Sequence, residues 1–197
     1  MSANVTNPGK DGCGPYGRHL TGVTSWQKYY GLSDSGWDVL QFVASTDYLT
    51  PIPPPSQNIN IDGIAYRITN AGHADSLVRV AIYDMETFPA GTLVVAAAEI
   101  TGSSAGLIVQ AMTASTLRAN GRYAALFAAS GTTLPKLSAS IAAYSNRSWL
   151  GTNGAVSPDE AIGSLTFTRV YGAFPATYNG AYASILRTKV GASLRLP

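Results

Sequence analysis

From Gln57 to the C-terminus, the chain alternates short apolar stretches with clusters of the turn-forming residues Gly, Pro, Asn, Asp and Ser. The apolar stretches have the length of strands, and none shows the periodicity of a helix that could connect parallel strands. Because the stretches recur every 10–15 residues or so, roughly the spacing of all-β domains, the pattern argues against a parallel α/β sheet. We expect a jelly-roll-like antiparallel β-sandwich of about eight strands.

The expected strands begin and end at these turn clusters. They are Asn58–Thr69, Leu77–Tyr83, Thr92–Ile100, Leu107–Met112, Arg122–Ala129, Lys136–Tyr144, Ser164–Tyr171 and Ala192–Leu196. Within the first of them, Asp62-Gly63 interrupts the alternation, which is typical of a β-bulge. Thr177–Ser184 holds few aliphatic residues, so we expect a loop there that packs on a neighbouring subunit.

The first part of the chain differs from the sandwich in composition. Residues 1–35 are rich in glycine and lack both strand and helix periodicity, and Pro51–Pro55 favours an extended polyproline spacer. We therefore predict an extended N-terminal anchoring arm with its Pro-rich spacer over residues 1–56 and a sandwich domain over residues 57–197. Deletion of residues 1–50 should then leave a folded sandwich.

Large aromatic residues occur in this arm: Tyr16, Trp26, Tyr29, Tyr30 and Trp37. Aromatic side chains in a segment that lacks a core of its own usually dock onto other protein. We expect these residues to anchor the arm to a neighbouring subunit or to another component of an assembly. Within the arm, residues 37–44 have the pattern of a short strand.

Charged residues make up 12% of the chain, about half of the share that is usual in globular proteins. Hydrophobic residues make up 46%, so the chain should fold, with much of its surface uncharged or covered by partners. This composition predicts a homo-oligomer. The cations form no basic cluster, and the apolar runs are far shorter than the roughly 20 residues that span a bilayer. We expect neither a nucleic-acid partner nor membrane insertion.

Residues suited to catalysis or metal binding are few. The two histidines, His19 and His73, and the single cysteine lack the spacing of a metal site. Carboxylates at turns commonly cap backbone amides. Alternatively, Asp75, Asp84 and Glu86 could surround a Ca²⁺ ion at one end of the sandwich. We expect no catalytic residue, no cofactor and no resident metal.

Exposed aromatic rings can stack on sugars. Candidates for contacts with a glycan or with another subunit lie in or beside the expected loops: Tyr144, Trp149, Tyr171, Tyr178 and Tyr182. For each of these rings, burial in the core or in a subunit interface competes with glycan binding. A sugar-cleaving enzyme would instead need paired carboxylates about 5–10 Å apart in a groove.

Several segments carry recognisable motifs. Leu77–Asp84 is followed by Phe88–Val94, and Leu117–Leu126 comes after them; Gly172–Tyr178 and Ser193–Leu196 close the chain. These segments resemble, in order, the "lRvgIYd…gPGtLv", "L.pG.YwlAv" and "g.lPAtf…lrv" motifs of the β-sandwich modules in bacteriophage tail fibres and virion appendages. In the second motif, Asn-Gly stands where Pro-Gly is common.

The resemblance covers residues 57–197 and implies a non-enzymatic virion structural protein. Such modules are commonly displayed as symmetric oligomers, here a homotrimer, docked on other virion proteins of the tail, neck or capsid. Assembly would take place in the host cytoplasm, since Met1–Lys10 lacks the layout of a secretory leader. The chain departs from the family at its N-terminus, where a compact arm replaces the long shaft of a typical fibre.

Three functions compete at this point. The first is a short tail fibre or appendage that docks through its arm and contacts host-surface glycans. The second is a capsid decoration or head-fibre protein whose arm lies over capsid subunits. The third is a carbohydrate-binding protein that acts alone.

Overall fold

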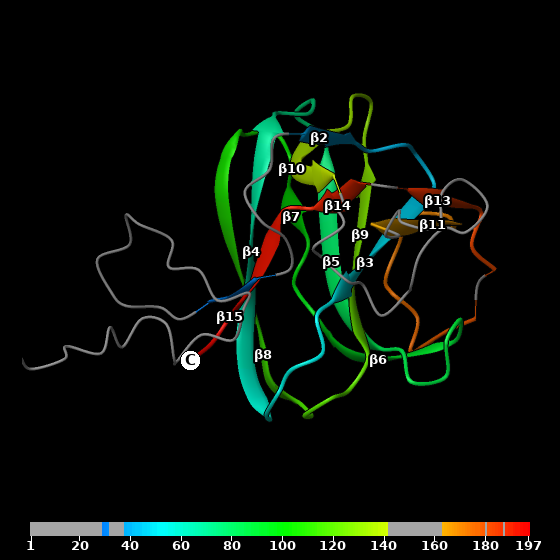
Figure 1. Ribbon diagram of the computed structural model, residues 1–197. Helices are drawn as coiled ribbons and strands as arrows, with labels where there is room; N and C mark the ends of the chain where they lie inside the picture. Colours follow the sequence, from blue (N-terminus) through cyan, green and yellow to red (C-terminus); the bar gives the residue numbers. More distant parts are fainter. Residues whose placement is uncertain (1–28, 32–37, 142–162, 180, 187) are drawn as a thin grey trace, which may run out of the picture.

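The described part of the chain consists of β-strands (Figure 1). The structure is a computed structural model that describes residues 29–31, 38–141, 163–179, 181–186 and 188–197. These residues form fifteen strands and no helix. All pairings between the strands are antiparallel. The strands form two curled sheets packed as a sandwich, so the expected antiparallel β-sandwich is confirmed.

One sheet has seven strands and contains both the first and the last described strand. Its order is β1 (Tyr29–Gly31), β15 (Ala192–Arg195), β4 (Ile59–Asn70), β10 (Lys136–Ile141) and β14 (Thr188–Val190), with β8 (Gly106–Leu117) paired to β4 and β2 (Asp38–Gln41) paired to β10. On one side of β4 lies β8, whereas β15 and β10 share the other side end to end.

The second sheet has eight strands. Its order is β12 (Thr177–Tyr178), β6 (Gly91–Ala96), β5 (Leu77–Asp84), β9 (Tyr123–Ser130), β3 (Thr46–Ile52), β11 (Ser164–Thr168) and β13 (Ser184–Leu186), with β7 (Ile100–Thr101) paired to β5. The central strand is β9, which pairs with β5 along its whole length and with β3 over most of it. Both edges of β9 are therefore shielded from water.

Each strand expected from the turn signals has a counterpart in the sandwich. The counterparts are β4, β5, β6 with β7, β8, β9, β10, β11 and β15. The register between β4 and β8 shifts between Ile61 and Gly63, where Asp62-Gly63 predicted a bulge. The stretch expected as one strand over Thr92–Ile100 is divided, because residues 97–99 leave the sheet.

The sheets correct the boundary expected at residue 57, because part of the predicted arm belongs to the sandwich. β3 lies between β9 and β11, and β2 pairs with β10. Pro51 continues β3, opposite Ala124 of β9, and does not begin a spacer. β11 pairs only with Thr46–Leu49 of β3, so at Pro51 the described neighbour of β3 is β9 alone. Proline has no N–H to donate to a second neighbour, and it is tolerated at such an edge position.

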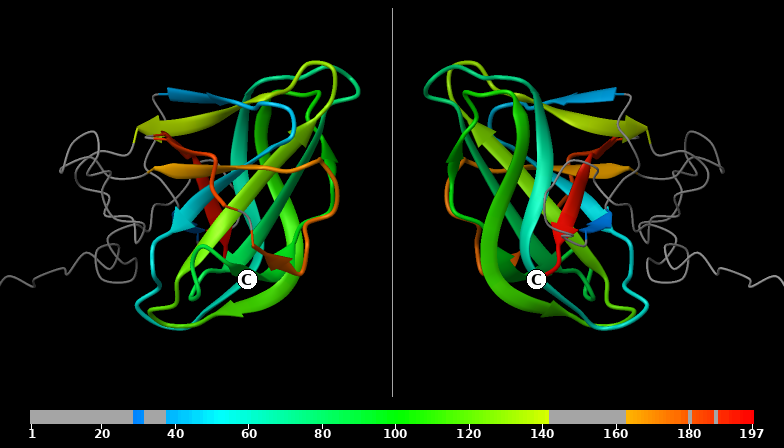
Figure 2. Two further views of the ribbon diagram at one scale, coloured as in Figure 1. Left: turned by 90° about the vertical axis from the view of Figure 1, so that its right-hand side faces the viewer. Right: turned by 90° about the vertical axis from the view of Figure 1, so that its left-hand side faces the viewer.

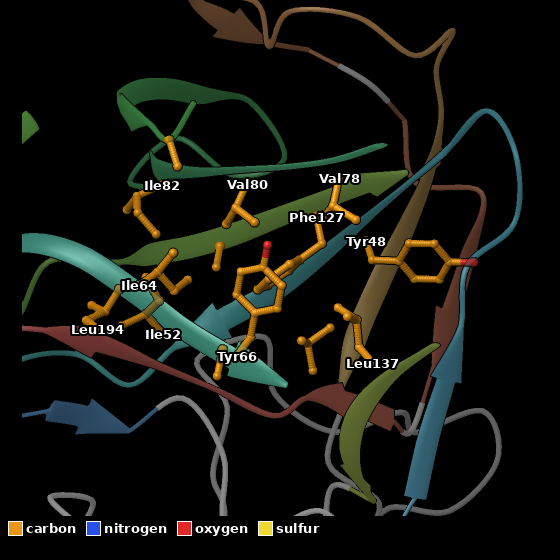
Figure 3. Close-up of a cluster of buried hydrophobic side chains, with 14 of the residues drawn as sticks. Tyr48, Ile52, Ile64, Tyr66, Val78, Val80, Ile82, Phe127, Leu137 and Leu194 are labelled. Carbon is orange, nitrogen blue, oxygen red and sulfur yellow. The ribbon is translucent and has the colours of Figure 1, made fainter. Parts of the chain in front are cut away.

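The main core fills the space between the two sheets (Figure 3). Tyr66 of β4 and Phe127 of β9 meet edge to face there, with ring centroids 5.7 Å apart. The Tyr66 hydroxyl donates a hydrogen bond to Oε1 of Gln110 at 3.0 Å, which satisfies the polar end of the ring. Aliphatic side chains of both sheets complete the cluster, among them Ile52, Ile64, Val78, Val80, Ile82, Leu137 and Leu194. Burial of one such side chain contributes about 1.5–3 kcal/mol, so this core dominates the stability of the fold.

Deletion of residues 1–50 should abolish cooperative unfolding, contrary to the expectation from sequence. The deletion removes β1, β2 and most of β3, so β9 loses the partner along one edge and the core loses Tyr48. Urea unfolding followed by circular dichroism measures this. The matched control is deletion of residues 1–28, which keeps all described strands and should unfold cooperatively. A cooperative transition in the longer deletion would contradict the placement of β3.

Candidate functional site

A segment of the chain crosses the outer face of the eight-stranded sheet. After β11 the chain passes to β12, which pairs with β6 (Figure 2, orange in the left-hand view). In the sheet order, β3, β9 and β5 lie between β11 and β6, so the segment spans these strands. The chain then returns to β13, which pairs with β11. We call residues 169–178 the strap.

The strap covers a second apolar cluster. Phe174 and Tyr178 of the strap meet Tyr83 of β5 edge to face, with centroids 6.4 and 5.7 Å apart. Tyr178 also meets Phe167 of β11, at 4.9 Å. Small side chains of β5 and β9 in the same cluster leave room for these rings: Ala81, Ala124 and Ala128. Both faces of β9 are thus buried, one by the opposite sheet and one beneath the strap.

A buried ion pair attaches both ends of the strap to the sheet. Asp47 of β3 is 1% exposed, and its two carboxylate oxygens accept hydrogen bonds from Nε and Nη2 of Arg169 at 2.5 and 3.2 Å. At the other end of the strap, the Tyr178 hydroxyl donates to Oδ2 of Asp47 at 3.1 Å. Burial raises the pKa of Asp47, and the hydrogen bonds from Arg169 and Tyr178 act against this shift.

The middle of the strap is held by further hydrogen bonds. The Arg169 guanidinium lies 4.9 Å from the ring centroid of Phe174. Its Nη1 donates to three strap carbonyls at 3.2–3.5 Å, those of Val170, Gly172 and Ala173. The Tyr83 hydroxyl donates to the carbonyl of Pro175 at 2.6 Å. Arg169 and the Tyr83 hydroxyl thus hold the middle of the strap, together with a backbone hydrogen bond from the Leu93 N–H to the Ala176 carbonyl.

A cluster of three polar side chains, of which Glu99 is exposed and Arg79 and Tyr171 are partly buried, lies beside the start of the strap. The Tyr171 hydroxyl and Nε of Arg79 both donate to Oε2 of Glu99, at 2.8 and 2.7 Å. The Arg79 guanidinium lies 5.7 Å from the centroid of the Tyr171 ring, within cation–π range. The hydrogen bond from Tyr171 lowers the pKa of Glu99, and burial raises the pKa of Tyr171 to about 12. These three side chains satisfy one another.

The described tyrosines expected at glycan or subunit contacts lie in different environments. Tyr178 is buried within its own chain, which is one of the two alternatives weighed for it, and Thr177–Tyr178 forms β12 in the region expected as a loop. Tyr171 is half-buried and is bonded to Glu99. Tyr182 is 49% exposed, so its ring is the most accessible of the three.

Other expected site residues lie outside the described residues. They are Tyr16, Trp26, Trp37, Tyr144 and Trp149. Tyr29 and Tyr30 lie in β1, whose backbone pairs with β15. The anchoring and glycan-contact roles of these seven residues stay predictions.

The carboxylates considered for Ca²⁺ do not meet. Asp75 precedes β5 and Asp84 ends it, and an extended strand of this length separates its ends by about 25 Å. One ion cannot bind both side chains, which corrects that hypothesis. In the part of the chain that the structure describes, no group of three or more His, Cys, Asp or Glu side chains could hold a metal ion.

These carboxylates hold loops in place instead. Asp75 accepts hydrogen bonds from the hydroxyl and the amide of Thr132, at 2.7 and 3.1 Å, and lies 2.8 Å from Nδ1 of His73. The hydrogen bonds from Thr132, followed by that of His73, lower the pKa of Asp75 to about 2. Asp84 pairs with Arg118 at 2.8 Å. Each carboxylate joins segments that are distant in the sequence.

The sequence patterns did not reveal Asp47, Arg169, Glu99 or Arg79 as partners. A signal exists for Asp47, which stands directly before the apolar Tyr48-Leu49 in a segment of strand length. A charge beside an apolar run marks either an exposed strand end or a buried pair. Its partner, 122 residues away, follows no sequence rule.

No protein-family model matches the chain, and no curated protein is significantly similar to it. Within the described residues, no helix is long and apolar enough to cross a membrane.

Asp47→Asn should lower the free energy of unfolding by about 3 kcal/mol, because it leaves the Arg169 guanidinium without its counter-ion beneath the strap. The matched control is Asp62→Asn, whose carboxylate pairs with Arg195 in a more exposed position, and here a loss of about 1 kcal/mol is expected. Urea unfolding at neutral pH measures both. Equal losses in the two variants would show that Asp47 does not anchor the strap.

The stability difference between the wild type and Asp75→Asn should depend on pH. The pKa of Asp75 is lower in the folded state, at about 2, so the carboxylate stabilises the fold above its ordinary pKa. This contribution is lost as the pH falls from about 5 to about 2. Unfolding curves of both proteins across this range should therefore converge at acid pH. A difference that stays constant would contradict the role of the Thr132 hydrogen bonds.

Proposed function

We propose that the chain is a non-enzymatic structural protein of a bacteriophage particle, an appendage module that docks through residues 1–28. The observation that carries this proposal is the pairing of Tyr29–Gly31 with Ser193–Arg195 at the edge of the seven-stranded sheet. This pairing joins the end of the arm to the sandwich through backbone hydrogen bonds. A segment that anchors a module to a particle needs such a fixed attachment, since a loose one would not position the module.

The engagement of the carboxylates supports a structural module over a sugar-cleaving enzyme. In the described residues whose side chains are placed, all six accept hydrogen bonds from partners that hold strands, loops or the strap: Asp47, Asp62, Asp75, Asp84, Glu86 and Glu99. A catalytic acid or base must reach its substrate. These groups serve the fold instead.

The motifs that resemble those of virion appendages occupy structural positions. Leu77–Asp84 is β5, and the Phe88–Val94 segment forms the turn into β6. Asn120 has a φ of 57°, and with Gly121 it makes the turn that precedes β9. The closing motif, Gly172–Tyr178, lies within the strap. The residues that carry the resemblance therefore cover the outer face of the eight-stranded sheet or form turns between its strands, as expected of residues that define a common fold.

Tyr182 is the described aromatic residue best placed for a host-surface glycan. Its ring is exposed, whereas Tyr171 and Tyr178 are engaged by their own chain. Stacking on a sugar needs an accessible ring. Within this proposal we therefore assign the glycan contact to Tyr182.

The test is incorporation into particles of the virus that encodes the chain. Deletion of residues 1–28 should leave the purified chain folded but absent from purified particles, as measured by quantitative mass spectrometry. Asp75→Asn, which perturbs a loop of the sandwich and keeps both the arm and the strands to which it is attached, should be incorporated normally. Electron microscopy of wild-type particles would then locate the module on the tail or on the capsid. Normal incorporation of the deletion would overturn the docking role.

A further inference from the structure

Nearly all edge strands of the described sandwich are short. β1, β2, β7, β12, β13 and β14 have between two and four residues each. β8 has twelve residues and, within the described sheets, pairs with β4 alone. An edge strand presents unpaired N–H and C=O groups to other chains, and short edges are one means of preventing such pairing. β8 lacks that protection.

The composition of β8 leaves its edge open as well. Its sequence, GLIVQAMTASTL, contains no charged residue and no proline, which are the residues that protect edges in other proteins. The register to β4 is irregular between Ala111 and Ser115, which bends the strand there. From Gly106 to Ala111 the register is unbroken. The regular, unprotected edge is therefore Gly106–Ala111.

This part of β8 also exposes apolar side chains on one face. Leu107 is 46% exposed and Val109 is 42% exposed, and they alternate along the outer face of the seven-stranded sheet. The next residue, Gln110, is buried on the other face of the strand and bonds to Tyr66 and to the carbonyl of Ala98. The right-hand view of Figure 2 shows β8 in green beside β4 at the front of the molecule. A single exposed Leu or Val is ordinary, but here two accompany an unpaired edge.

We propose that β8 pairs antiparallel with β8 of a second copy of this chain, around a two-fold axis at Val109. The two seven-stranded sheets would then form one continuous sheet. An uncharged strand meets its own copy without like-charge repulsion, and β8 offers no charge that a charged partner could recognise. Pairing centred on Val109 uses residues 107–111, all within the regular edge, and places Leu107 opposite the symmetry-related Ala111.

The antiparallel direction follows from the two faces of the sheet. A two-fold axis perpendicular to the sheet keeps the outer faces of both copies on the same side. A two-fold axis along the strands would give parallel pairing and would turn one molecule over, so that the exposed Leu107 and Val109 of the two copies would lie on opposite sides of the joined sheet and could not pack together. The proposed contact is isologous and gives a dimer, whereas the family resemblance implies a trimer. The measured mass therefore distinguishes the two.

Sedimentation equilibrium of the full chain tests the proposal. The wild type should have twice the 20.6 kDa mass of one chain. Val109→Lys brings two ammonium groups together at the axis and should raise the dissociation constant at least about tenfold. Val170→Lys is the matched control, since Val170 is 82% exposed in the strap, and it should leave the dimer unchanged. Circular dichroism checks that both variants fold.

Disulfide formation gives a second readout that does not depend on the folding of the lysine variant. Directly opposite residues of antiparallel strands have Cα atoms about 4.5–5.5 Å apart, within the range of a disulfide. In a Cys13→Ser background, Val109→Cys should form a cross-linked dimer on oxidation, and Val170→Cys should not.

A monomeric wild type would overturn the β8 contact. So would an oligomer whose mass Val109→Lys leaves unchanged, or the failure of Val109→Cys to cross-link. The proposed virion role does not depend on the β8 contact, because it is tested by a different experiment, the incorporation of the chain that lacks residues 1–28. If the wild type is a monomer and is still incorporated into particles, the β8 contact is contradicted and the docking role is not.

Discussion

The central strand of the eight-stranded sheet sets the main constraint on this fold. β9 has apolar residues on both faces, so the sheet needs cover on both sides. The opposite sheet covers one face, and the strap covers the other with rings that fit against alanines. A sandwich with polar outer faces needs no such cover. The strap, its aromatic residues and its anchoring pair all follow from the composition of this one strand.

Two kinds of interaction hold the strap: burial of aromatic rings stabilises it, and an ion pair positions it. The rings of Phe174 and Tyr178 remove apolar surface from water, which supplies most of the favourable free energy. The pair between Asp47 and Arg169 contributes less net stability, since both charges leave water to form it. Its hydrogen bonds have direction, however, and they determine where the strap lies. Apolar burial thus stabilises the strap and the ion pair positions it.

The sequence predicts the sandwich well where strands are bounded by turn residues, and poorly where a strand depends on a distant partner. β4, β5 and β9 are bounded by Gly, Asn and Asp, and their expected limits agree with the structure to within one residue. β3 was not predicted, because Asp47, Thr50 and Pro51 interrupt its apolar pattern. Asp47 is compatible with a buried strand only through Arg169, 122 residues later. The burial of Tyr178 likewise depends on residues of three other strands, so the sequence left this residue open between the core and the surface.

The strap follows in the chain the strands that it covers, and this order has a consequence for biosynthesis. β3, β5 and β9 leave the ribosome well before residues 169–178 do, because chains emerge from their N-terminal end. Until then the outer face of this sheet has no intramolecular cover, and its alanines, Leu126 and Tyr83 are available to chaperones or to other nascent chains. The translation speed over the roughly forty codons between the end of β9 and the start of the strap, about 2–8 s at ordinary elongation rates, therefore sets how long the nascent sheet is open to aggregation.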